Sequence, residues 1–151
     1  MVVIEPHECF EMKPASFAIS LQNSLDELGR ASTEIRGFLA QHPVNARAAY
    51  SVDLILEEIA TNTFRYGYDG EGPHSIAVTV SLAPHAITLS IEDDGREFNP
   101  LAAPIPEPAE DLEHTPLGGK GLLLVRAMIR SGEYQRIGSR NKLVLQIDNP
   151  G

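Results

Sequence analysis

A glutamate and an asparagine four residues apart are the first side chains in this sequence whose types and spacing could do chemistry. They are Glu58 and Asn62, in the segment 56–62. Residues four apart on an α-helix lie one turn from each other on the same face. An asparagine oxygen is a hard ligand that suits Mg²⁺, and a glutamate one turn away could orient a water or accept a hydroxyl proton. A helix-surface pair that also involves Arg65 is the alternative.

Two aspartates and a glycine form the second candidate, directly after a run of alternating apolar residues. Asp93, Asp94 and Gly95 follow a strand predicted at 87–91. An aspartate buried at a strand end can accept a hydrogen bond from an exocyclic amine, and a glycine beside it lets a planar ring approach the backbone closely. Phe98 would pack behind that ring or cover it. The same residues also fit an ordinary Asp-Gly turn.

A cluster of small residues and one lysine forms the third candidate: Gly118, Gly119, Lys120 and Gly121. It opens the apolar segment 122–129, which predicts a helix. Glycines at a helix start expose backbone N–H groups that can hold phosphate oxygens. The spacing is neither that of a Walker A loop nor that of a dinucleotide-binding fingerprint, and a flexible loop is the alternative.

Helices must position the first of these candidates. The apolar spacing predicts a helix from Asn45, a plausible N-cap, to about Phe64, with the glutamate–asparagine pair at the edge of its core-facing arc. An earlier helix is expected behind Ser24, which has capping-box spacing to Glu27, and it ends by Pro43.

Strands must position the second candidate. Alternating apolar residues predict strands at 17–21, 76–82, 87–91, 134–137 and 143–147. With the helices, this order predicts an α+β domain of two layers, in which a single sheet is covered on one face by helices. Residues 1–15 show no period and predict an extended arm. The segment 100–117 holds five prolines and four acidic residues, which indicates a functional lid or a disordered insert.

The composition of the 151 residues is that of one globular domain, with 42% hydrophobic and 22% charged residues. Asp and Glu outnumber Lys and Arg by 21 to 12, so the net charge of −9 argues against nucleic acids and anionic membranes as partners. The single cysteine, Cys9, excludes a disulfide framework within the chain. We find no signal peptide and no apolar stretch of membrane-spanning length, and therefore expect a cytoplasmic protein.

Together and in order, the three candidates resemble the N, G1 and G2 boxes of the GHKL ATPase and kinase superfamily. The pattern E-x-x-x-N is Glu58–Asn62, D-x-G is Asp93–Gly95 and G-x-G is Gly119–Gly121. The segments around these boxes resemble, more specifically, the anti-sigma factor serine/threonine kinases of the RsbW and SpoIIAB type. The resemblance covers roughly residues 16–148.

The resemblance implies a Bergerat ATP-binding fold with a mixed sheet, in a domain at 16–148. Glu58 would be the catalytic base, Asn62 the Mg²⁺ ligand and Asp93 the carboxylate that reads adenine, and 100–117 would be the ATP lid. The residues implied to bind the cofactor are Asn62, Asp93, Gly95, Phe98, Gly118, Gly119, Lys120, Gly121 and Leu122.

The activity implied by the resemblance is phosphorylation, with Mg²⁺ and ATP, of a serine or threonine on a small anti-anti-sigma protein of the STAS type. Such proteins also sequester a sigma factor, often as homodimers. A second hypothesis is a nucleotide-binding interaction module, in which ATP only sets the shape of a regulatory surface and no phosphate is moved. The two hypotheses differ in whether a partner protein becomes labelled by ATP.

Overall fold

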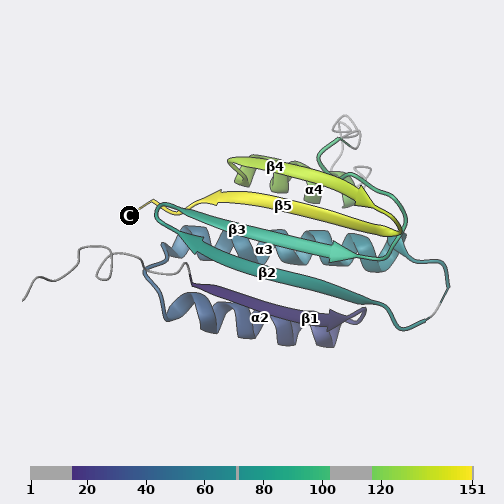
Figure 1. Ribbon diagram of the computed structural model, residues 1–151, viewed down its shortest axis with the longest axis horizontal. Coiled ribbons are helices and arrows are strands. Elements are labelled where there is room, and N and C mark those ends of the chain that lie inside the picture. The colour runs from purple at the N-terminus through teal and green to yellow at the C-terminus, as the bar shows by residue number, and fades with distance from the viewer. Residues whose placement is uncertain (1–14, 71, 103–116, 151) are drawn as a thin grey trace, which may run out of the picture.

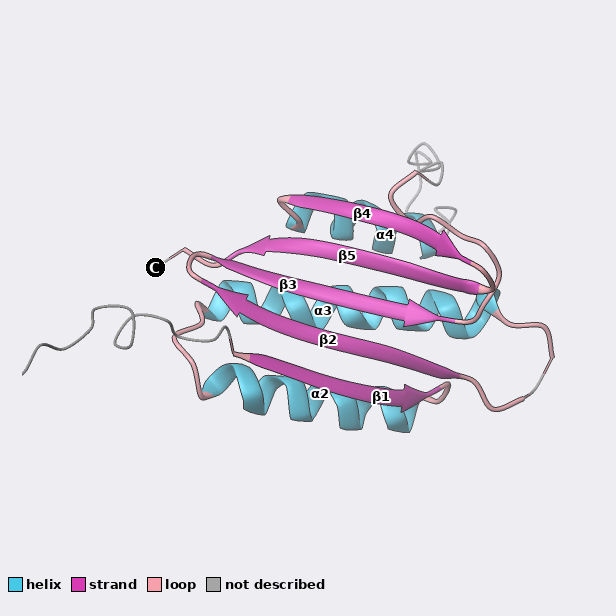
Figure 2. Cartoon of the chain, viewed as in Figure 1, coloured by secondary structure: helices cyan, strands magenta, loops and turns pink. Residues whose placement is uncertain are grey.

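The computed structural model describes residues 15–70, 72–102 and 117–150, apart from the side chains of residues 117–120. Three helices, a short π-helix and five strands follow one another in this part of the chain (Figures 1 and 2). Their bounds are β1 (Ser16–Gln22), α2 (Leu25–Ala40), α3 (Ala46–Asn62), η1 (Thr63–Gly67), β2 (Ser75–Ala83), β3 (Ala86–Asp93), α4 (Leu117–Met128), β4 (Ser131–Ile137) and β5 (Arg140–Asp148).

The two long helices are capped by the residues that the sequence predicts. The Ser24 hydroxyl accepts a hydrogen bond from the Glu27 backbone N–H at 3.2 Å, and the Asn45 side chain accepts one from the Arg47 N–H at 2.8 Å. Such caps satisfy backbone donors that the first helical turn leaves without a partner. Helix α3 passes at Thr63 into the π-helix η1, which the sequence analysis did not predict.

The strands are ordered β1-β2-β3-β5-β4, and each described pairing is antiparallel. The α+β class is confirmed, but the expectation of a mixed sheet is wrong for these pairings. Two helices separate β1 from β2, so the chain returns to the end of the sheet that it left and β2 runs antiparallel to β1. One helix separates β3 from β4, which do run in the same direction, but β5 lies between them.

The hydrophobic core lies between the sheet and the helices, which cover one face of it in Figure 1. Alternate residues of the three central strands face the helices and are buried: Ile76, Val78, Val80, Ile87, Leu89, Ile91, Leu143, Leu145 and Ile147. Helix α3 contributes an apolar stripe of Ala48, Val52, Ile55, Leu56 and Ile59. Both periods, two in the strands and about 3.6 in the helix, are those read from the sequence.

The topology brings four ends of elements together, on the right in Figure 1. Strand β3 ends there at Asp93, and β5 begins beside it, since Asp93 and Asn141 are partners in the β3–β5 register. Helix α3 ends there at Asn62, and α4, which packs beside α3, begins there at Leu117. The three candidate motifs therefore lie on neighbouring segments.

Two regions expected from the sequence fall largely outside the described residues. They are the predicted arm, save Ala15, and the predicted lid, save residues 100–102 and 117. None of the helices in the described part of the chain has the length and apolar character needed to cross a membrane.

Candidate functional site

The Glu58 side chain reaches from α3 to the first turns of α4. A Cβ atom placed on Gly121 would overlap the Glu58 carboxylate and would lie 2.8 Å from Glu58 Cδ. Position 121 is buried, and only glycine leaves room for the glutamate there. The first and third candidates, which are distant in the sequence, are therefore in direct contact.

The glycines lie inside α4 and not before it. The sequence placed the helix at 122–129, with Gly118–Gly121 as its opening, whereas α4 already begins at Leu117. Glycine is a poor helix former, but the close approach of Glu58 makes it necessary at position 121. The first turn of a helix leaves backbone N–H groups without intrahelical partners, so this end of α4 offers donors to an anion.

Asn62 occupies the last position of α3, one turn after Glu58, and its side chain is partly buried. Its carboxamide makes no hydrogen bond within the described part of the chain, and neither does the Glu58 carboxylate. Arg65 is exposed and pairs with neither of them. The surface cluster of Glu58, Asn62 and Arg65 that the sequence also allowed does not form, and no described residue holds the Glu58 carboxylate or the Asn62 carboxamide.

Asp93 is buried at the end of β3, with 7% of its surface exposed. Its Oδ1 accepts hydrogen bonds from the Gly95 backbone N–H at 2.8 Å and from Asn141 Nδ2 at 2.9 Å. Its Oδ2 accepts none from any described residue. A buried carboxylate is costly unless it is hydrogen-bonded, and here one oxygen is satisfied while the other stays available as an acceptor.

The turn after β3 is hydrogen-bonded to the π-helix η1, which directly follows α3. The Gly67 carbonyl, in η1, accepts a hydrogen bond from the Arg96 backbone N–H at 2.8 Å. A Cβ atom on Gly95 would lie 2.9 Å from that carbonyl and 2.9 Å from Asp93 Oδ1. Glycine at position 95 therefore allows the turn to approach the backbone of Gly67 and the Asp93 carboxylate closely. The approach of a planar ring to Gly95 stays a prediction. The contact places the second candidate next to the first.

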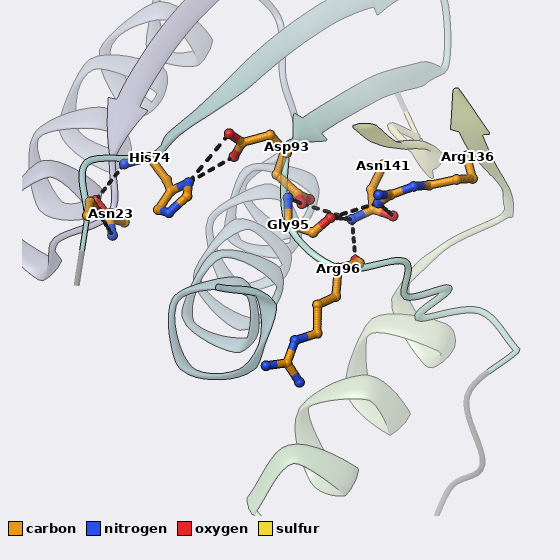
Figure 3. Close-up of polar contacts among 9 residues, drawn as sticks. Asn23, His74, Asp93, Gly95, Arg96, Arg136 and Asn141 are labelled. Atoms are coloured by element: carbon orange, nitrogen blue, oxygen red, sulfur yellow. Dashed lines mark hydrogen bonds and ion pairs between the residues drawn. The ribbon is translucent and has the colours of Figure 1, made fainter. Parts of the chain in front are cut away.

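Asn141 is a polar residue that the sequence analysis missed. It is buried at the start of β5, and Figure 3 shows its amide among Asp93, Gly95 and Arg96 on one side and Arg136 on the other. One signal could have found it. Position 141 is an inward position of β5, in alternation with the buried leucines and isoleucine of that strand, so an asparagine there breaks an otherwise apolar pattern.

A stacked pair of rings lies beside the same turn. The Tyr68 and His74 rings are parallel within 7°, with centroids 3.9 Å apart, and His74 Nδ1 lies 3.3 Å from the Asp94 carboxylate. Asn23 holds the His74 backbone by accepting a hydrogen bond at 3.2 Å (Figure 3). Burial raises the pKa of the Tyr68 hydroxyl, and the charges of Asp93 and Asp94 add to this. That hydroxyl is buried without a partner among the described residues.

Three further residues that were expected to bind the cofactor lie in different surroundings. Phe98 is 46% exposed, and its backbone N–H points at Asn141 Oδ1 at 3.4 Å, while the covering of a ligand by its ring stays a prediction. Leu122 is 6% exposed and packs in the hydrophobic core, which makes packing the role that its side chain has here. The side chain of Lys120 lies outside the described residues, so its reach toward phosphate stays a prediction.

Comparison with known sequences gives a family and a relative. The family described as the histidine kinase-like ATPase domain matches residues 21–147. The serine/threonine-protein kinase BtrW of Bordetella bronchiseptica is 29% identical to this chain over 101 residues, which are 67% of this chain and 71% of that protein.

Comparison with solved structures gives the same fold. The crystal structure of the RsbU and RsbW domains of Rv1364c from Mycobacterium tuberculosis aligns with a TM-score of 0.62 at 15% identity, over 90% of this chain and 33% of that chain. The Acinetobacter baumannii histidine kinase AdeS aligns at a TM-score of 0.47 and 15% identity, over 95% of this chain and 72% of that one. Because the family match covers well over half of its residues, the chain belongs to the histidine kinase-like ATPase family.

Proposed function

We propose that this protein is an ATP-dependent serine/threonine kinase of the anti-sigma type. It would bind Mg²⁺ and ATP, phosphorylate a small anti-anti-sigma protein of the STAS type and thereby regulate a sigma factor. The observation that carries the proposal is the contact of Glu58 with Gly121, together with a buried Asp93 that has one oxygen without a partner among the described residues. The similarity of the chain to BtrW, a serine/threonine-protein kinase, supports the same activity.

The residues present fit Mg²⁺ held together with phosphates. The described residues contain no cluster of three or more His, Cys, Asp or Glu that could hold a metal ion by itself. Mg²⁺ seldom needs such a cluster, since it keeps several waters and is often bound through few protein oxygens and substrate phosphates. The Asn62 carboxamide, which makes no hydrogen bond to any described residue, would supply such an oxygen. When bound, the ion would neutralise charge on the phosphates.

Each part of the site would then have one task. Asp93 Oδ2 would accept a hydrogen bond from the adenine amine, and the backbone N–H groups at the start of α4 would bind phosphate oxygens. Glu58 would accept the proton of the substrate hydroxyl while the hydroxyl oxygen forms a bond to the γ-phosphorus of ATP. The bond between that phosphorus and the bridging oxygen, which leaves with ADP, would break at the same time. Phosphoryl transfer depends mainly on positioning and electrostatics, so a site of this size is sufficient.

Neighbouring glutamates on α3 allow a matched test of the base. Glu58→Gln keeps the size of the side chain but removes its ability to accept a proton, and we expect transfer to fall about a hundredfold or more with ATP affinity retained. Glu57→Gln makes the same change at an exposed position and should transfer as the wild type does. The measurement is transfer of radiolabelled γ-phosphate to purified STAS-type anti-anti-sigma proteins.

The outcomes separate the two functions considered for this chain. Full transfer by Glu58→Gln would remove Glu58 from the role of base. ATP binding by the wild type without label on any tested partner would favour the interaction module, in which nucleotide only shapes a surface.

A further inference from the structure

Asn141 is directly opposite Asp93 in the sheet. The two residues are register partners in the antiparallel β3–β5 pair, and residues directly opposite each other have Cβ atoms only about 5 Å apart. Both are buried, at 6% and 7% exposed. A buried polar side chain at a strand end, facing a buried carboxylate, needs a hydrogen-bonding reason to be there.

The hydrogen bonds of Asn141 fix the orientation of its amide. Its Nδ2 donates to Asp93 Oδ1 at 2.9 Å and to the Arg96 carbonyl at 2.7 Å, so both N–H groups are used. Its Oδ1 accepts from the Tyr134 hydroxyl at 2.5 Å and from Arg136 Nη1 at 3.0 Å. A flipped amide would turn its oxygen to the carboxylate and its NH₂ to a guanidinium, so only one orientation is satisfied.

The orientation of Asn141 determines which oxygen of Asp93 can meet a ligand. The Asn141 and Gly95 donors together occupy both acceptor positions of Oδ1, and Oδ2 is left as the acceptor without a described partner. Arg136 adds a positive charge behind the amide, where its described partners are neutral oxygens. The amide thus lies between a cation and an anion, with its dipole aligned to both.

We propose that Asn141 is a positioning residue for nucleobase selection. It holds the Asp93 carboxylate so that Oδ2 accepts a hydrogen bond from the exocyclic 6-amino group of an adenine nucleotide. This inference rests on the proposed nucleotide-binding function and adds to it the source of base selectivity. Asn141 itself touches no ligand, so its effect must appear through Asp93.

A pair of nucleotides that differ in one amino group tests this role. ATP carries the 6-amino group, whereas purine riboside 5′-triphosphate has a hydrogen in its place. The wild type should bind ATP more tightly, and in Asn141→Ala the ratio of the two affinities should fall about tenfold, because a hydrogen bond to a charged acceptor is no longer aligned. If Asn141 had only a structural role, its loss would weaken the binding of both nucleotides equally and leave the ratio of their affinities unchanged.

A second variant keeps the test decisive if Asn141→Ala does not fold. Asn141→Leu keeps nearly the size of the side chain but offers no donor to Asp93 Oδ1. It should lose the preference for ATP to the same extent. Asn149→Ala removes another buried asparagine, just beyond the opposite end of β5, where it bonds to the backbone of Asn45 and Pro43, and it should keep the wild-type ratio.

The possible results have distinct meanings. Failure of the wild type to bind ATP would overturn the proposed function. ATP binding by the wild type with an unchanged affinity ratio in both Asn141 variants would overturn the role of Asn141 alone. A lowered ratio in both, with the wild-type ratio in Asn149→Ala, is the result that the hydrogen bonds of Asn141 predict.

Discussion

Glu58 holds its position because Gly121 has no side chain. Its carboxylate occupies the space over the α4 backbone that any Cβ atom would need, and no described residue binds it. From there it is close to the start of α4, whose backbone N–H groups are proposed to bind phosphate, and it is one turn from Asn62. The contact between this carboxylate and this glycine therefore links the proposed proton acceptor on α3 to the proposed phosphate-binding end of α4.

Substitution of this glycine tests that link. In Gly121→Ala the new methyl group displaces the Glu58 carboxylate, and we expect phosphoryl transfer to fall about tenfold or more, since small displacements of reacting groups are costly. Gly37→Ala, in α2, meets no atom within 4 Å and is the control. It should stabilise the fold by about 0.5–1 kcal/mol through helix propensity and leave transfer unchanged. Wild-type transfer in Gly121→Ala would contradict the importance of the contact.

Tyr68 makes a prediction for alkaline pH. Burial raises the pKa of its hydroxyl above the ordinary value of 10.0, so above about pH 10 the unfolded chain releases this proton more readily than the folded one. The free energy of unfolding should therefore decline as pH rises past 10, and less steeply in Tyr68→Phe. Near neutral pH this variant should be as stable as the wild type or up to about 1 kcal/mol more stable, because the buried hydroxyl has no described partner.

Urea unfolding at pH 8 and between pH 10 and 11 measures both effects. Tyr50→Phe removes a phenol that is 62% exposed and serves as the control. An alkaline decline equally steep in Tyr68→Phe and in the wild type would contradict the assignment to Tyr68.

The sequence predicted some residues of the candidate site and missed others. Glu58, Asn62 and Asp93 were recognisable because their spacing, or their place after an apolar run, is a local signal. The role of Asn141 was not, because its partners lie on β3, on β4 and in the turn after β3, and only the strand register brings them together. Tyr68 likewise meets His74 through the fold, across a turn that has no regular period.

At the scale of elements, the site is assembled from the ends of α3, β3, α4 and β5. Each end is fixed by a contact to another element: Glu58 to α4, the Gly67 carbonyl to the turn after β3, and Asn141 to Asp93. The far ends of the same elements carry helix caps and turns instead. We therefore expect changes at the far end to alter stability without altering the site.

The N-cap of α3 tests this separation. Asn45→Ala removes the side-chain acceptor of the Arg47 N–H and should lower the free energy of unfolding by about 1 kcal/mol. The dissociation constant for ATP should stay within about twofold of the wild type, because α3 carries the residues proposed to act on ATP at the opposite end. Urea unfolding and nucleotide titration measure the two quantities. A fivefold weaker affinity for ATP would show that the two ends of α3 are coupled.

Elements also differed in how far the sequence determined them. The starts of α2 and α3 were predictable because a cap is a local hydrogen bond, and the strands because every second residue is apolar. The start of α4 was placed too late, because the contact that requires glycine at 121 comes from another helix. The π-helix η1 has no local signature in its sequence. The antiparallel pairing of the strands depends on how many helices lie between two strands in the chain, which no local pattern records.

At the scale of the whole molecule, the chain carries a net charge of −9 and yet is proposed to bind a polyanion. Long-range attraction cannot bring ATP to such a surface. The affinity must come from local devices: the backbone donors at the start of α4, the Asn62 oxygen with Mg²⁺, and the hydrogen bond that Asp93 accepts. If these devices act in one site, nucleotide binding should depend strongly on the metal ion.

Calorimetric titration of ATP, with Mg²⁺ and with a chelator in its place, tests this claim most directly. The wild type should bind ATP in Mg²⁺ and lose about tenfold or more of its affinity in the chelator, equivalent to ~1.4 kcal/mol or more. Asn62→Ala should remain folded and bind ATP with the same weak affinity in both conditions. Wild-type affinity and full Mg²⁺ dependence in Asn62→Ala, or no ATP binding by the wild type, would contradict the account.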